Sequence, residues 1–430
     1  MHNRTSKNHT TLPQPVEPSR TRRSFLGKSA ALAGGVLTAN GATAQSGDSL
    51  PPNVPQWMKR EGHPLTWNPY GLPSAFEKHV VRSGRGDQVM PGAGSLQSPL
   101  QDLRGMITPN GLVFERSHAG IPDIDPAQHR LMIHGLVRRP MIFSMDDLVR
   151  FPSVSRIHFL ECSGNSSREW RAPFGNSVQI THGLVSCCEW TGVMLSTLLE
   201  EVGLEPQAKW VLAEGADAAA MTRSVPMDKC LEDAMLVYSQ NGEMLRPQQG
   251  YPLRLFLPGF EGNMSVKWLR RLKVDSEPFM TREETSKYTD PLVDGTARQF
   301  TFMMEAKSVI TYPAPDHRLK GRGFYEISGI AWSGRGRVRR VDVSVDGGRA
   351  WREAQLQEPV LHRAVTRFRL PWNWNGGDAI LQSRVMDESG YVQPTREQLI
   401  AQRGYNSVYH YNAIQSWKVA AGGEVTNVHA

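Results

Sequence analysis

The sequence has only four cysteines in 430 residues, Cys162, Cys187, Cys188 and Cys230. None of them belongs to a CxxCH, CxxC or zinc-type array, which excludes covalent c-type haem, an iron–sulfur signature and a structural zinc motif. The adjacent Cys187 and Cys188 would form a strained disulfide. We interpret them as small residues that pack at a helix start before Trp190 rather than as a redox relay.

Long apolar runs are absent after residue 44, which predicts a mature chain without a membrane span. Before that point, Arg22-Arg23 precedes an apolar stretch rich in alanine and glycine, and the small-residue pattern Ala42-Thr43-Ala44 follows. We interpret residues 1–44 as a twin-arginine signal peptide cleaved after Ala44. The expected location is the periplasm, reached by export of the already folded protein with its cofactor inserted.

The mature chain also has little net charge. The whole sequence is +7 at pH 7, but residues 1–44 hold six Lys/Arg and one acid, so about +2 remains after cleavage. The basicity therefore belongs mostly to the signal peptide and gives no case for nucleic-acid binding. About 386 residues, within a chain that is 39% hydrophobic, are enough for two domains with a sizeable core.

Cys162 follows a short apolar run, Ile157 to Leu160, and precedes the turn-forming sequence Ser-Gly-Asn-Ser-Ser. A strand that ends at a lone cysteine beside such a turn presents sulfur to a pocket. From chemistry alone three interpretations stand: a nucleophilic thiol, a single thiolate ligand to a soft metal, or an inert buried cysteine.

The periodicity of the chain changes near residue 300. Residues 45 to about 115 are rich in proline, glycine and polar turns and predict an irregular surface segment. Between 130 and 275, short β-type runs (130–134, 209–213, 252–257) alternate with helical stretches (144–150, 191–202). From 300 onwards, runs of period two (324–331, 338–345, 364–370, 379–385) and the hairpin signal Asp346-Gly347-Gly348 predict a β-sandwich.

Five motifs, in order, resemble those of the sulfite oxidase family of molybdenum enzymes. They are Phe114 to His118, Cys162 to Asn165, Glu189 to Gly192, Arg254 to Leu269, and Val341 to Trp351. Each pattern is weak alone, but five at compatible spacing are specific. With the export signal, the turn after Cys162 and the segments around Thr181 to Gly183 and Cys187 to Trp190 most resemble the molybdenum subunits of bacterial sulfane dehydrogenases in the Sox thiosulfate-oxidation system.

The resemblance implies an α+β fold: a mixed α/β molybdopterin-binding catalytic domain over residues 45–300, followed by an Ig-like β-sandwich dimerisation domain over 301–430. It implies one molybdopterin with molybdenum, for which Cys162 is the protein thiolate. The residues that match cofactor-binding positions are Phe114, Arg116, His118, Cys162, Gln249, Arg254, Ser265 and Lys267. Those that match or approach catalytic positions are Arg116, Tyr288, Arg403 and Arg168.

The sequence departs from the family pattern beside the expected metal. Two arginines usually follow the cysteine element in sulfite oxidases, whereas Ser166 and Ser167 stand there and Arg168 comes one position later. A family tryptophan is absent near Ile180, and Gln249 replaces a family histidine. Compared with the family pattern, these positions have less positive charge and smaller side chains. Such a change suits a site that is enlarged for a sulfur chain attached to a carrier protein.

The resemblance implies oxidation of carrier-bound sulfane sulfur by oxygen-atom transfer. Since the chain has no haem motif, it also implies a separate c-type cytochrome as electron acceptor, and a homodimer of this chain within a heterotetramer. Three alternatives remain at this stage: a dehydrogenase for free sulfite, a periplasmic reductase of oxidised methionine, and a metal-free exported binding protein with an Ig-like domain.

Overall fold

The computed structural model describes residues 55–59, 61, 69–86 and 92–430. The twin-arginine segment that we expect at 1–44 lies outside the described residues. Contacts divide the chain into the units Met1–Leu72 and Pro73–Ala430, and the fold below is that of the second unit. Among the described residues, none of the helices has the length and apolar character needed to cross a bilayer.

The segment before residue 118 contributes one small antiparallel sheet. Its strands are β1 (Ser83–Gly86), β2 (Gly94–Gln97) and β3 (Glu115–Ser117). Turns and short 3₁₀ segments make up most of the rest of its described part. This agrees with the irregular segment that the proline and glycine content predicts, and β3 supplies one wall of the site described below.

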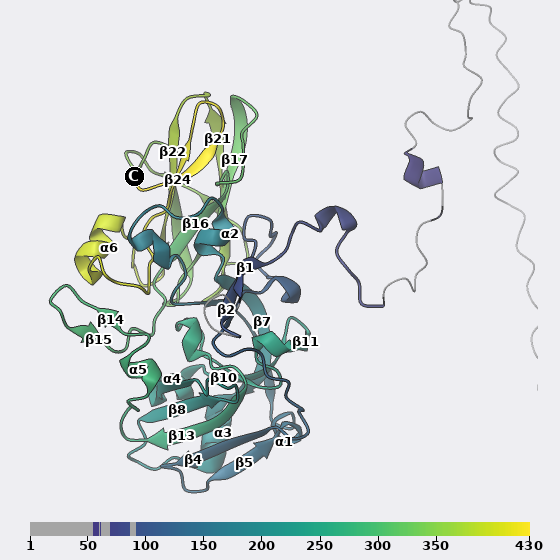
Figure 1. Cartoon of the computed structure of the whole chain (residues 1–430), viewed down its shortest axis with the longest axis vertical. Coiled ribbons are helices and arrows are strands. Elements are labelled where there is room, and N and C mark those ends of the chain that lie inside the picture. The colour runs from purple at the N-terminus through teal and green to yellow at the C-terminus, as the bar shows by residue number, and fades with distance from the viewer. Residues whose placement is uncertain (1–54, 60, 62–68, 87–91) are drawn as a thin grey trace, which may run out of the picture. The chain divides into compact units, whose positions relative to one another are not determined.

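A five-stranded sheet with the order β5-β4-β13-β8-β9 forms one side of the N-terminal part (Figure 1). The strands are β4 (Arg130–Gly135), β5 (Met141–Ser144), β8 (Trp210–Gly215), β9 (Thr222–Pro226) and β13 (Leu269–Asp275). Within it, β13 runs parallel to β4 and antiparallel to β8. Three short helices lie near this sheet: α1 (Met145–Leu148), α3 (Leu195–Val202) and α4 (Met227–Glu232). The strands expected at 130–134 and 209–213 are therefore confirmed within one or two residues.

A second sheet has the order β11-β10-β7-β6, with β12 paired to β10. Its strands are β6 (Ser153–Glu161), β7 (Val185–Met194), β10 (Met235–Gln240), β11 (Glu243–Met244) and β12 (Arg254–Phe256). The helix expected from Thr191 was wrong at its start, because β7 continues to Met194 and α3 begins at Leu195. Cys187 and Cys188 accordingly lie inside a strand rather than at a helix start, and both are free and buried.

The C-terminal part is the expected β-sandwich. One sheet has the order β16-β17-β21-β20 and the other β19-β18-β22-β23-β24. The strands are β16 (Lys307–Tyr312), β17 (Gly323–Trp332), β18 (Val338–Ser344), β19 (Arg352–Glu353), β20 (Gln355–Leu356), β21 (Thr366–Trp374), β22 (Ala379–Asp387), β23 (Ser416–Val419) and β24 (Val425–Val428). As expected from Asp346 to Gly348, β18 turns back to pair with β19, and Gly347 and Gly348 have positive φ.

Between the two parts lie α5 (Arg282–Thr285) and the hairpin β14 (Asp290–Pro291) and β15 (Ala297–Arg298). The domain boundary that we expect near residue 300 falls between β15 and β16. The two remaining helices are α2 (Val178–His182) and α6 (Arg396–Arg403). One apolar cluster includes Leu100, Phe159 and Val178 together with the sandwich core, so the two parts share buried surface.

Candidate functional site

A pocket opens where β6 ends. Its lining comes from segments far apart in the sequence: Phe114, Arg116, Ser117, His118, Leu160, Cys162, Asp217, Met221, Gln249, Arg254, Gly262, Asn263, Ser265, Val266, Lys267, Trp268 and Tyr288. All eight expected cofactor-binding residues and Tyr288 are therefore brought together.

Cys162 is placed in this pocket by the turn that follows β6. Its backbone N–H donates to Leu184 O at 3.0 Å, and its carbonyl accepts from Asn165 N–H at 2.9 Å. Ser166 ends the turn with φ 64°, a left-handed conformation that costs free energy for a serine. Burial raises the pKa of the Cys162 thiol. A thiol in such a place is a poor free nucleophile, but a metal would deprotonate it on binding.

Two basic side chains line the pocket, the buried Arg254 and the partly buried Lys267. Arg254 donates to Gln249 O and to Ser265 O, both at 3.0 Å, and its Nε is buried without a hydrogen-bond partner. Lys267 Nζ donates to Arg116 O, Ser117 Oγ and Gln248 O at 3.0 to 3.1 Å. Burial lowers the pKa of Arg254 to about 10, and burial with the charge of Arg254 lowers that of Lys267 to about 7.

Neither cation forms an ion pair with any carboxylate of the described residues at 4.0 Å or less. Buried charges are costly unless they are paired. Ser265 Oγ accepts from Leu257 N–H at 3.0 Å, and its own O–H is still available to donate a hydrogen bond. Guanidinium, ammonium and hydroxyl donors around one cavity form a binding site for a phosphate-bearing group.

A second group of lining residues, called the Tyr288 wall below, consists of Arg116, His118 and Tyr288. Arg116 Nη1 donates to Gly94 O at 3.2 Å and to the carbonyl oxygen of Ser117. The Tyr288 hydroxyl and His118 Nε2 are hydrogen-bonded at 3.0 Å. Burial, followed by the charges of Arg116 and Lys267, lowers the pKa of His118 to about 4, whereas burial raises that of Tyr288. At neutral pH both side chains are therefore uncharged, and Arg116 is the cation on this wall.

Two expected catalytic arginines do not line this pocket. Arg403 is buried and lies 3.5 Å from Asp290 Oδ2, because a buried guanidinium needs a counter-charge. Arg168 is exposed, and its guanidinium carbon lies 4.1 Å from the centre of the Phe174 ring, beside a different cavity. We therefore correct their placement: the structure does not bring them together with Cys162.

Sequence reasoning missed Asp217 and Asn263, which also line the pocket. Each has a buried side-chain oxygen, Oδ1, that accepts no hydrogen bond. Asp217 comes two residues after β8 ends at Gly215, so a carboxylate directly after a buried strand was the signal that could have revealed it. An unpaired carboxylate oxygen in a cationic pocket suits the amino and ring N–H groups of a pterin.

Within the part of the chain that the structure describes, no group of three or more His, Cys, Asp or Glu side chains could hold a metal ion. A cofactor that has both a phosphate and a hydrogen-bonding ring system fits three features of this lining. They are Arg254 Nε and the Asp217 oxygen, which have no hydrogen-bond partner, and Lys267, which has no ion pair.

Comparisons with known proteins agree with this geometry. The family model for the oxidoreductase molybdopterin binding domain matches residues 118–283, and that for the Mo-co oxidoreductase dimerisation domain matches 298–417. Mitochondrial sulfite oxidase of Mus musculus is 34% identical over 272 residues, which cover 59% of this chain and 50% of that protein. An NADH nitrate reductase of Ulva prolifera is 34% identical over 283 residues, which cover 57% and 32%. The chain thus spans half or less of the length of these two relatives.

A solved structure gives a more complete match. The crystal structure of the sulfane dehydrogenase SoxCD from Paracoccus pantotrophus has 47% sequence identity and a TM-score of 0.86, covering 88% of this chain and 98% of the matched chain. The cofactor of the site is molybdenum with molybdopterin, which the matched domain binds and the donor set fits. Cys162 would hold the metal, while Arg254, Lys267 and Asp217 would hold the pterin and its phosphate. The chain belongs to the sulfite oxidase family of molybdenum oxidoreductases.

Proposed function

We propose that this chain is the catalytic subunit of a periplasmic sulfane dehydrogenase. It would oxidise sulfane sulfur that is attached to a carrier protein, as a step of thiosulfate oxidation. The molybdenum cofactor, when bound, supplies oxygen-atom transfer and two-electron redox chemistry. The similarity to a sulfane dehydrogenase of known structure supports the class of reaction, and the twin-arginine sequence supports the location.

The position of Arg168 is the observation that favours carrier-bound sulfur over free sulfite as the substrate. Ser166 and Ser167 follow the cysteine turn, and Ser166 Oγ donates to Thr181 O at 2.8 Å, away from the pocket. Because Arg168 packs on Phe174, the residues after Cys162 add no cation to the site. A free sulfite dianion needs several positive charges around it, whereas a sulfur chain bonded to a carrier presents less charge. A pocket that gains no cation from the residues after Cys162 therefore suits a sulfur chain bonded to a carrier.

The remaining side chains have separate roles in this proposal. Arg116 would orient the polar end of the substrate, since it is the cation of the Tyr288 wall. Tyr288 keeps its proton because burial raises its pKa, so its hydroxyl can donate a hydrogen bond to an oxygen near Cys162. When no substrate is present, the Tyr288 hydroxyl is hydrogen-bonded to Nε2 of the neutral His118 at 3.0 Å. These groups are only partly exposed, which limits the competition of bulk water for the same hydrogen bonds.

Electron transfer and assembly complete the proposal. The chain has no haem motif, so a separate c-type cytochrome would take the electrons one at a time. The β-sandwich would pair two copies of this chain, which the match to a dimerisation domain supports. With the cytochrome, the assembly would be a heterotetramer. Affinity purification of the native periplasmic complex, followed by haem staining, tests this part: a complex without a c-type cytochrome contradicts it.

The substrate is tested by turnover of the purified enzyme at equal molybdenum content. We expect a carrier protein loaded with persulfide to be oxidised with a higher kcat/KM than free sulfite, with cytochrome c reduction as the readout. A clear preference for free sulfite would instead make the chain a sulfite dehydrogenase. Protein without molybdenum despite intact Cys162 would favour a binding protein.

A further inference from the structure

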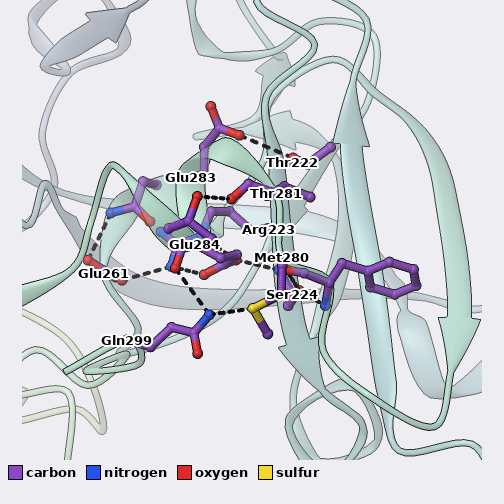
Figure 2. A network of polar contacts seen from close by, with 12 residues as sticks. Thr222, Arg223, Ser224, Glu261, Met280, Thr281, Glu283, Glu284 and Gln299 are labelled. Atoms are coloured by element: carbon purple, nitrogen blue, oxygen red, sulfur yellow. Dashed lines mark hydrogen bonds and ion pairs between the residues drawn. The ribbon is translucent and has the colours of Figure 1, made fainter. Parts of the chain in front are cut away.

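A buried charge cluster lies behind the pocket and has no role in the function proposed so far. Arg223, in β9, is fully buried; its Nε donates to Glu284 Oε1 at 3.0 Å, and its Nη2 donates to Glu261 Oε1 at 3.3 Å. Glu284 also accepts from Ser224 N–H at 2.7 Å. Figure 2 shows Arg223 between the two carboxylates. One guanidinium thus meets two buried carboxylates that differ in what else they contact.

Glu261 connects this cluster to the turn that carries Cys162. Its Oε2 accepts from Asn263 Nδ2 at 2.9 Å and lies 3.3 Å from His410 Nε2. Asn263 Nδ2 also donates to Ser163 Oγ at 3.1 Å, and His410 N–H donates to Ser163 O at 2.9 Å. Ser163 directly follows Cys162. Glu284, by contrast, contacts Arg223, Ser224 and Gln299, none of which lines the pocket.

Glu261 also fixes the orientation of the side-chain amide of Asn263. Burial opposes the ionisation of Glu261, but Arg223, His410 and Asn263 together lower its pKa to about 2. An ionised carboxylate only accepts hydrogen bonds, so the NH₂ group of Asn263 must face it. The amide oxygen, Oδ1, is then left on the other side, buried and without a partner, on a residue that lines the pocket.

The chemistry of this free oxygen limits its ligand. An amide oxygen accepts hydrogen bonds and repels the anionic oxygens of sulfur oxoacids, so it does not bind an anionic substrate directly. The hydrogen bond from Asn263 Nδ2 to Ser163 Oγ joins this amide to the residue that follows Cys162, whereas Asp217 carries another acceptor of the lining without a partner. A buried acceptor without a protein partner suits a water molecule, which has two protons to donate and fits a small space.

Building on the proposed function, we propose that Asn263 Oδ1 holds the water molecule that the oxidation consumes, and that Glu261 is a positioning residue that orients Asn263. For each two-electron oxidation of sulfur, the oxygen of one water becomes bonded to sulfur. Two protons pass to solvent, and two electrons pass singly to the cytochrome. Asn263 would fix one O–H of this water and so orient its oxygen.

The first test compares Asn263→Ala with Glu284→Gln, using enzyme with measured molybdenum content. Asn263→Ala should lower kcat about threefold to tenfold, the range for one lost hydrogen bond, with KM for the sulfur substrate within about twofold. Glu284→Gln removes a carboxylate from the same Arg223 but leaves Asn263 in place. It should lower the melting temperature and leave kcat unchanged. Equal effects of the two variants on kcat would reduce the cluster to a structural role.

A polarity swap provides a second, independent measurement. Asn263→Asp alone places two carboxylates side by side and should lower kcat further. Adding Glu261→Gln restores a donor facing residue 263 and an oxygen facing the pocket, so the double variant should recover at least half of the loss. An additive double variant contradicts the orientation argument.

A crystal structure of the loaded wild-type enzyme gives a readout that does not depend on activity. We expect an ordered water within hydrogen-bond distance of Asn263 Oδ1. A pterin N–H at that position would overturn the inference while leaving the proposed function intact. If the loaded wild type oxidised no sulfur compound, the proposed function would fail, and this crystallographic test would still decide whether Asn263 binds water.

Discussion

At the scale of single residues, the site is defined by two basic side chains that form no ion pair with a carboxylate of the described residues. Arg254 and Lys267 meet carbonyls and hydroxyls rather than carboxylates, and the orphaned Arg254 Nε marks an unsatisfied donor. Such an arrangement destabilises the protein alone and stabilises the complex with an anion, because any ligand that binds only the folded state adds to its stability. The pocket is therefore built around its cofactor rather than around its own packing.

Cys162→Ser should abolish sulfur oxidation and leave the fold intact. A serine hydroxyl remains protonated and is a poor ligand for a soft metal, while it fills nearly the same volume. Turnover per mole of protein, molybdenum content and the thermal unfolding curve are the measurements. Cys187→Ala is the matched control, because Cys187 is equally a free cysteine but lies outside this pocket. Retained oxidation by Cys162→Ser would refute its role as the metal ligand.

His118 should make the protein sensitive to acid. The unfolded chain binds a proton at this histidine below about pH 6.5, but the folded chain does so only near pH 4, because of burial and the charges of Arg116 and Lys267. Lowering the pH from 6.5 to 4 therefore favours the unfolded state, by at most about 3 kcal/mol, and the penalty is absent above pH 6.5. Urea unfolding at pH 7 and pH 4.5 should show a smaller loss for His118→Gln than for the wild type. Equal losses would contradict this role.

At the scale of elements, the sequence predicted what is local and missed what depends on pairing. Period-two runs identified β17, β18, β21 and β22, and β21 has the alternating burial that such a run implies, because every second residue from Thr366 to Trp374 is buried. The helix expected from Thr191 begins later, at Leu195, because Thr191 to Val193 pair with both β6 and β10, and tertiary pairing overrides a helical pattern.

The same distinction holds for the site. Motifs located Cys162, Arg254 and Lys267 because their neighbours in sequence are characteristic of the family. The hydrogen bond from Lys267 to Arg116 joins residues 151 positions apart, which no local pattern contains. Arg403 and Arg168 were misplaced for a related reason: their partners, Asp290 and Phe174, are set by packing rather than by spacing.

A substitution at Gly192 tests the pairing of β7 with β10 in the segment where a helix was expected. A Cβ at this position would lie 2.0 Å from Leu236 O on β10, and 2.7 Å from Val237 Cα. Backbone cannot yield as a side chain does, so Gly192→Ala should separate β7 from β10 and cost roughly 3 kcal/mol or more of unfolding free energy. Gly377→Ala is the control, because its Cβ would meet only the side chain of Asn375 at 3.3 Å. A cost below about 1 kcal/mol at Gly192 would contradict the close pairing of β7 with β10.

At the scale of the whole molecule, a buried polar junction links the Cys162 turn to the sandwich. Glu161, the last residue of β6, is 3.1 Å from Lys307 Nζ on β16 and accepts from Trp332 Nε1 on β17 at 2.6 Å. Asn165, in the turn after Cys162, donates to the same carboxylate at 2.9 Å. The position of the metal-binding turn therefore depends on strands more than 140 residues away, and the sandwich supports the site besides its expected role in dimerisation.

Lys307→Met should destabilise the protein by about 3 to 5 kcal/mol, because it leaves the Glu161 carboxylate buried without its counter-charge. Adding Glu161→Gln removes that charge and should recover much of the loss, since the glutamine can still accept from Trp332. Arg335→Met is the matched control: its pair with Glu305 is more exposed, at 41% for the arginine side chain, and should contribute about 1 kcal/mol or less. Denaturant unfolding of the three variants and the wild type measures the stabilities, and cytochrome reduction measures whether the Cys162 turn has moved. If Lys307→Met cost no more than Arg335→Met, the junction would be dispensable. If it lost stability while keeping full turnover, the sandwich would support the fold without positioning the site.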